Sequence, residues 1–147
     1  MRSHLLRGAL ASVLALGLLL GTPLASSASP TGKERRLLKL VNRARAKRDL
    51  PWLKARESVR KKSHRHSVKM GEAGTIFHVD CLICLLPDGF STIGENVAMA
   101  PTIREAHRAL MRSAPHRHNL LNRDFRVAGF GVVKRGVYFF VTQRFLG

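Results

Sequence analysis

Apolar residues recur along the chain with two periods, one typical of helices and one typical of strands. The first run follows the i, i+3, i+4, i+7 spacing of a helix face and consists of Leu37, Leu40, Val41 and Ala44. Thr31 and Glu34 precede it with the spacing of a capping box, in which the two residues exchange side-chain and backbone hydrogen bonds. The pattern predicts a helix over residues 34–48 that ends before Pro51, whose ring cannot continue a helix.

The next helix is more polar than the first. A thin apolar stripe predicts it over residues 54–71, and the stripe consists of Ala55, Val59, His66 and Met70. Gly71 and Gly74 stand at its end, as glycines commonly do at helix C-termini. Residues 75–93, which contain the turn signal Pro87-Asp88-Gly89, are predicted to form a loop.

Two short helices are predicted in the C-terminal half. Thr102 and Glu105 repeat the capping-box spacing in front of a helix that extends to about residue 112. A further short helix is expected after Pro115. The inward-facing residues of the two helices are Ile103, Ala106, Leu110, Leu120 and Leu121.

Towards the C-terminus the apolar residues recur at every second position, the period of a strand. Val127–Val133 and Val137–Phe145 are predicted to be strands joined by a turn, and Glu95–Met99 is predicted to be a third, short strand. Apolar side chains alternate onto both faces of the last strand, so both faces of the sheet must be covered. The expected fold class is α+β, an α-β-α sandwich with a small antiparallel sheet between helices.

Composition and charge narrow the possible classes of protein. The 147 residues are enough for one domain of ordinary size, and 26 Lys and Arg against nine acidic residues give a net charge of +17. Only one apolar run approaches membrane-spanning length, which excludes a multi-pass membrane protein. Glycine-rich phosphate-binding loops are absent, which disfavours many nucleotide-dependent enzymes.

The single long apolar run lies at the N-terminus and has the layout of a secretory signal peptide. Arg2 and Arg7 form the basic region, Ala9–Leu20 the apolar region, and cleavage is expected after Ala28. An uncleaved anchor is the alternative, although the run is short for a span of about 20 residues. We therefore expect a signal peptide at 1–28, one domain at 29–147, and a secreted, extracellular protein.

Five sequence segments, in their order along the chain, resemble the CAP superfamily of cysteine-rich secretory proteins, antigen 5 and pathogenesis-related proteins. They are Leu37–Arg45, Phe77-His78, Gly94–Ala98, Ser113–Leu121 and the C-terminal stretch 129–145. The match is to the compact bacterial secreted branch, and the family's α-β-α sandwich agrees with the fold expected from periodicity. Two departures are Asp49, where the family usually has Gly, and Leu110, where it usually has Trp.

The resemblance implies that His78, Glu95 and His116 project into one cleft. Two neutral imidazoles and a carboxylate can hold zinc or another divalent metal, with the carboxylate either ligating the ion or orienting one ring. Eukaryotic members add a second Glu, and Ser113 stands at the matching position here. If the protein is an enzyme, the same three residues are the catalytic candidates for a metal-dependent hydrolase.

Ser113, His116 and Glu95 could instead form a hydrolase triad. We favour the interpretation that Ser113 caps the helix that opens at Pro115, because no nucleophile elbow or oxyanion donor accompanies it.

The remaining polar and aromatic residues of note are given structural roles. Asn42 and Arg45 are expected to make structural hydrogen bonds, and Met70 and Trp52 to lie in the core. The other histidines are assigned to the surface or to the basic helix and are His64, His66, His107 and His118. His64 and His66 are two residues apart and do not share a helix face, so they make a poor metal pair.

Cys81 and Cys84 are the only cysteines and are expected to form a disulfide, because the chain is predicted to be secreted. A thioredoxin-like redox motif is the alternative, although no βαβ pattern surrounds the pair.

The predicted second helix carries seven basic residues: Lys54, Arg56, Arg60, Lys61, Lys62, Arg65 and Lys69. Such a field predicts attraction to anionic cell-envelope polymers or lipid headgroups, with a merely solubilising surface as the alternative. No nucleic acid partner and a monomer are expected. The function expected overall is a non-catalytic extracellular binding module, its ligand a lipid, sterol or other hydrophobic small molecule by resemblance, with the hydrolase as alternative.

Overall fold

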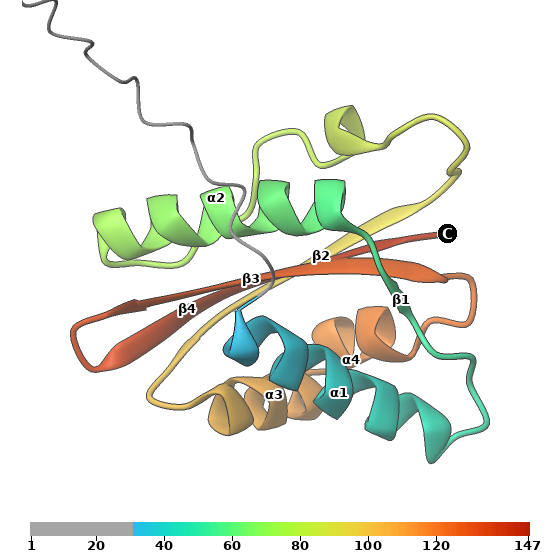
Figure 1. Cartoon of the computed structure of the whole chain (residues 1–147), viewed down its shortest axis with the longest axis horizontal. Helices are drawn as coiled ribbons and strands as arrows, with labels where there is room; N and C mark the ends of the chain where they lie inside the picture. Colours follow the sequence, from blue (N-terminus) through green and yellow to red (C-terminus); the bar gives the residue numbers. More distant parts are fainter. Residues whose placement is uncertain (1–30) are drawn as a thin grey trace, which may run out of the picture.

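The computed structural model of the protein describes residues 31–147 and has three layers (Figure 1). The signal peptide expected at residues 1–28 lies outside the described residues. The helices are α1 (Gly32–Ala46), α2 (Glu57–Ala73), α3 (Ile103–Arg112) and α4 (Ala114–Leu121), with a 3-10 turn η1 (Ile83–Leu85). The strands are β1 (Lys54–Ala55), β2 (Ile93–Ala100), β3 (Val127–Arg135) and β4 (Tyr138–Leu146). Helix α2 covers one face of the sheet, and α1, α3 and α4 cover the other (Figure 1). The α+β sandwich is thereby confirmed.

The four strands lie in the order β1-β3-β4-β2, so β1 and β2 form the two edges. The β3–β4 hairpin and the β2–β4 pair are antiparallel, as predicted. Strand β1 was not predicted, and it runs parallel to β3, so the sheet is mixed rather than wholly antiparallel. Its residues were assigned to the second helix, which in fact begins at Glu57, because the Lys54 and Arg56 amides donate to carbonyls of 126 and 128.

The larger core lies between the sheet and α1, α3 and α4. It includes every predicted inward residue of α3, and Leu120 of α4 is fully buried while Leu121 is only partly covered. Met70, Val97 and Phe140 form a smaller cluster beneath α2. The alternation expected along the last strand is therefore confirmed, since Phe140 and Val141 face opposite layers.

Buried polar residues of α1 tie this helix to the loops around it. The Arg45 side chain is fully buried and donates to four backbone carbonyls, those of Pro51, Leu120, Asn122 and Phe125. Asn42 exchanges two hydrogen bonds with the backbone of Leu53. The structural roles expected for Asn42 and Arg45 are confirmed.

The two predicted capping boxes differ in the structure. Thr31 and Glu34 exchange both hydrogen bonds of a capping box, at 2.9 and 3.2 Å. At α3 the Glu105 amide donates to the Thr102 hydroxyl, but the Glu105 carboxylate accepts from that same hydroxyl instead of from the backbone. The start of α3 therefore has only one of the two hydrogen bonds of a capping box.

Two further predictions were wrong. Trp52 is not a core residue but is 67% exposed, because it lies beside the sheet edge rather than under a helix. His107 is not a surface residue but is partly buried on α3, with its Nδ1 atom enclosed and without a hydrogen-bond partner among the described residues. Met70 is fully buried, as expected. Within residues 31–147, no helix combines the length and apolarity that crossing a membrane requires.

Candidate functional site

The three residues of the expected cleft lie around β2, the edge strand opposite β1. His78 follows α2 on one side of the sheet, Glu95 stands on β2 itself, and His116 belongs to α4 on the other side. Helix α4 is attached to this edge by the Asn96 side-chain amide, which donates to the His116 carbonyl at 3.1 Å. An edge strand has no neighbour beyond it, so side chains from both covering layers can meet there.

Glu95 is almost fully buried and is held by three donors. Its Oε1 atom lies 3.0 Å from His78 Nδ1 and accepts from the Val79 amide, and its Oε2 atom accepts from Arg144 Nε at 2.8 Å. The β2–β4 register places Arg144 directly opposite Glu95. The carboxylate therefore orients the His78 ring and fixes the loop that carries it.

His116 is oriented by a different partner. Its Nδ1 atom lies 2.8 Å from the Ser113 hydroxyl. Ser113 occupies the N-cap position of α4, but its side chain makes no capping hydrogen bond, so the predicted cap is wrong. Burial, and to a smaller degree the charge of His78, lower the pKa of His116, which keeps this ring neutral at physiological pH.

This arrangement limits the chemistry of the cleft. Both rings use Nδ1 for an orienting contact, which leaves Nε2 of each as the ligating atom. Glu95 pairs with His78 rather than with His116, so the Ser113-His116-Glu95 relay of a triad is not assembled. Among residues 31–147, no group of three or more His, Cys, Asp or Glu side chains is arranged to hold a metal ion.

A network of side-chain amides next to Glu95 was not assigned a role by sequence reasoning. Asn119 donates to the Glu95 carbonyl and to Asn96 Oδ1, and Asn96 in turn donates to Gln143 Oε1. Asn96 on β2, and Gln143 and Arg144 on β4, interrupt otherwise apolar strands, and Asn119 reaches them from α4. That interruption is the signal in the sequence that could have identified them, because a buried polar group in a strand needs a specific partner.

The loop between α2 and β2 carries the cysteines. Cys81 and Cys84 are joined by a disulfide, as predicted, a few residues after His78. His64 and His66 point to different partners: His64 Nδ1 contacts Glu34 Oε1 and His66 Nε2 contacts the Phe77 carbonyl. Neither contacts His78, Glu95 or His116 through these hydrogen bonds.

Comparison with known proteins decides the family. The model of the cysteine-rich secretory protein (CAP) family matches residues 38–145, most of the chain. The chain belongs to the CAP family. Its departure at Asp49 is accommodated locally, since this residue adopts a left-handed backbone with φ of 52°, where the family usually has Gly.

Three bacterial proteins illustrate the similarity of this chain to known proteins in sequence and in structure. The uncharacterized protein YkwD of Bacillus subtilis (strain 168) is 28% identical over 134 residues, which cover 86% of this chain and 51% of YkwD. An extracellular SCP-domain protein of Bacillus anthracis is 27% identical with a TM-score of 0.66, over 78% of this chain and 40% of that one. An outer surface protein of Borrelia burgdorferi is 20% identical with a TM-score of 0.71, over 81% of this chain and 95% of that one. The chain thus spans about half the length of YkwD.

Proposed function

We propose that this CAP domain is an extracellular, non-catalytic binding module whose cleft takes up a divalent cation such as zinc through Nε2 of His78 and Nε2 of His116. The observation that carries the proposal is that each ring is oriented through Nδ1, by Glu95 in one case and by Ser113 in the other. Metal-binding histidines are commonly held in this way. Extracellular placement is supported by the N-terminal signal pattern and by the extracellular SCP-domain neighbour.

Glu95 acts in this proposal as an orienting residue, not as a ligand. Its two oxygens accept from three donors, and withdrawing the carboxylate from Arg144 would leave a buried guanidinium without its partner. Two imidazoles with water in the other positions make a weaker site than three protein ligands. When bound, the ion would supply a point of attachment for an oxygen-bearing ligand group.

The first test is zinc titration of the purified protein by calorimetry at pH 7.5. We expect one saturable site, and we expect His78→Ala and His116→Ala each to weaken it by about tenfold or more. Ser113→Ala should weaken it less, since it removes only the group that orients His116.

His118→Ala is the matched control, because His118 is exposed on the same helix as His116. Equal zinc binding in the wild type, His78→Ala and His116→Ala would contradict the metal site. The absence of saturable zinc binding would contradict it as well.

The metal-dependent hydrolase is the second candidate, and one observation favours it. His78 and His116 both use Nδ1 for the orienting contact, so an ion held by Nε2 of the two rings would keep open positions for a water molecule, as catalytic zinc sites do. Zinc-loaded protein can be assayed with ester, peptide and glycan substrates in the same series. Turnover that requires zinc and is lost in His78→Ala and His116→Ala would favour catalysis over binding.

A further inference from the structure

The Cys81–Cys84 disulfide lies on the long loop between α2 and β2. The 3-10 turn η1 starts between the two cysteines, and Figure 1 shows it beyond the start of α2, away from the sheet. Cys81 and Cys84 are both exposed, and Ile83 between them is 64% exposed. This part of the chain is therefore accessible to a thiol in solution.

The disulfide adds little to the stability of the fold. The two cysteines are three residues apart, and closing so short a loop removes little conformational entropy from the unfolded chain. The bond also joins two residues of one loop rather than two helices or strands. The packing of the layers therefore does not depend on it.

The part of the loop before Cys81 is held by other contacts. His66 Nε2 lies 2.8 Å from the Phe77 carbonyl oxygen, and the two rings meet edge to face with centroids 5.2 Å apart. The next two residues are fixed by the Glu95 carboxylate, which lies 3.0 Å from His78 Nδ1 and accepts from the Val79 amide. None of these contacts involves a cysteine.

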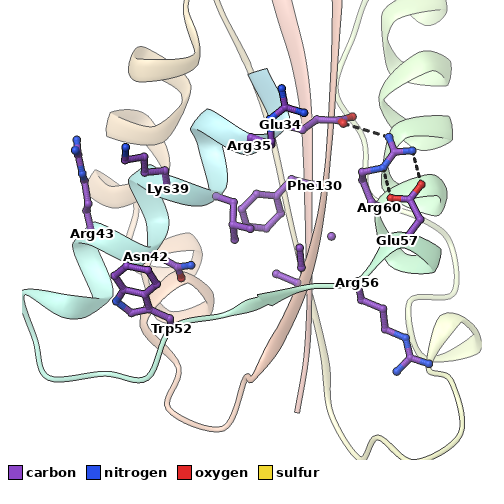
Figure 2. Close-up of a pocket in the computed structure, with 14 residues that line it drawn as sticks. Glu34, Arg35, Lys39, Asn42, Arg43, Trp52, Arg56, Glu57, Arg60 and Phe130 are labelled. Atoms are coloured by element: carbon purple, nitrogen blue, oxygen red, sulfur yellow. Dashed lines mark hydrogen bonds and ion pairs between the residues drawn. The ribbon is translucent and has the colours of Figure 1, made fainter. Parts of the chain in front are cut away.

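The part of the loop after Cys84 is held as well. The Arg56 side chain points away from α1 (Figure 2), and its guanidinium lies 4.9 Å from the centroid of the Phe90 ring. The Ser91 and Thr92 amides donate to the Gly147 carbonyl at 2.8 and 3.1 Å. Because both ends of the loop are fixed without the disulfide, the chain can keep its fold when that bond is open.

We propose that Cys81 and Cys84 form a redox-active site that exchanges with the thiols of a second molecule and passes between disulfide and dithiol with the fold intact. Exposed disulfides are commonly the labile or catalytic ones, whereas buried structural disulfides resist reduction. The substrate class is a dithiol, such as two cysteines of a flexible peptide. The attacking thiolate is an anion, which the net charge of +17 attracts.

The exchange takes place in two steps. A substrate thiolate attacks one sulfur of the protein disulfide, forms a mixed disulfide and releases the other protein cysteine as a thiolate. The second substrate thiolate then attacks the substrate sulfur of the mixed disulfide, which forms the substrate disulfide and releases the second protein thiolate. The substrate loses two electrons and two protons, and Cys81 and Cys84 take them up. Glutathione disulfide reoxidises the pair by the same steps and leaves two molecules of reduced glutathione.

The first test equilibrates the purified protein in buffers with different ratios of reduced glutathione to glutathione disulfide. EDTA is present to remove divalent metal from the thiols. Acid quenching, alkylation and mass spectrometry count the thiols. We expect two alkylated cysteines at high reduced glutathione, none at high glutathione disulfide, and full return when the buffer is exchanged. Circular dichroism of the two forms should coincide.

The second test measures oxidation of a synthetic peptide with two cysteines, with glutathione disulfide as the oxidant. We expect the wild type to accelerate it about tenfold or more relative to Cys81→Ser with Cys84→Ser. This double variant is the matched control, because it keeps the charge and the loop contacts of the wild type. Cys84→Ser alone should accumulate a mixed disulfide at Cys81, since no second protein thiol is left to release it.

Three results would overturn the inference. These are alkylation that does not change with the glutathione ratio, loss of the fold on reduction or in the double variant, and equal peptide oxidation by wild type and double variant. The site does not depend on the metal cleft, because EDTA is present in every exchange assay. Failure of zinc uptake alone would overturn the metal proposal and not this one.

Discussion

Arg45 is a single buried charge that connects α1 to several segments of backbone around it. No carboxylate lies opposite it among the described residues, and its guanidinium donates to backbone carbonyls of the 51, 120, 122 and 125 positions. Burial lowers the pKa of Arg45, but its ordinary value is so high that the group stays charged. The five N–H donors of the planar guanidinium allow this one residue to hold the end of α4 and the loops around it together.

His107 carries a prediction about pH. Burial lowers its pKa, so the folded state favours the neutral ring, whereas the unfolded state takes up a proton near pH 6.5. The stability associated with this group is therefore fully present above pH 6.5 and is lost as the pH falls through the lower folded-state value. We expect the free energy of unfolding to fall between pH 7 and pH 5 by less in His107→Leu than in the wild type.

Urea unfolding at the two pH values measures this difference. His118→Leu is the control, because His118 is exposed and should leave the slope unchanged. If the free energy of unfolding changed equally with pH in the wild type and in His107→Leu, the His107 ring would not be the source of the pH dependence.

At the scale of elements, the close packing of α2 on β3 depends on two glycines of β3, which have no side chain. A Cβ atom at Gly131 would collide with the backbone of Ser63 and His64, and one at Gly129 with the backbone of Val59 and Arg60. The Ser63 hydroxyl donates to the Gly129 carbonyl at 2.8 Å, which joins helix and strand at this close approach.

We predict that Gly131→Ala lowers the free energy of unfolding by about 3 kcal/mol, since backbone rather than a flexible side chain must move. Chemical denaturation measures the loss. Gly32→Ala is the control: its Cβ would meet only one Arg35 atom at 4.0 Å, and a near-neutral effect is expected. Equal stability of the two variants would mean that α2 can shift on the sheet without cost.

At the scale of the whole molecule, the net charge of +17 favours attraction to anionic surfaces without a specific binding site. Of the seven basic residues assigned to the second helix, Lys54 and Arg56 precede it, and Arg60 is buried in pairs with Glu34 and Glu57. The hydrogen bonds that Arg60 donates to Glu57 raise the pKa of Arg60, and this guanidinium is already paired within the fold. Lys62 is half-buried, and Lys61, Arg65 and Lys69 are the cations among the seven that α2 exposes to solvent.

We predict that the protein binds anionic lipid headgroups or anionic polymers and that this binding weakens with salt. The Debye length falls to about 3 Å at 1 M salt, so attraction by a diffuse field should then be lost. Cosedimentation with phosphatidylglycerol vesicles at low and high salt measures this binding. The triple variant Lys61→Gln, Arg65→Gln and Lys69→Gln should bind the vesicles less than the wild type does. Binding that is insensitive to salt would rule out this mechanism.

The sequence by itself determined the elements whose signals are local. Period and capping residues identified α1, α3 and the β3–β4 hairpin, because side-chain spacing along one segment decides which face is buried. The ordered family motifs pointed to His78, Glu95 and His116, of which His78 and Glu95 are in contact. Spacing and the expected compartment predicted the Cys81–Cys84 pair.

Only the tertiary structure decided which partner each polar side chain takes. Glu95 pairs with Arg144 and His78, Ser113 with His116 instead of the α4 backbone, and residues 54–55 with β3 instead of the helix that follows. The exposed Trp52 and the pocket beside it, between α1 and the start of α2 (Figure 2), also arise from this edge pairing. These contacts join residues far apart in the chain, and local propensity does not choose among distant partners of similar chemistry.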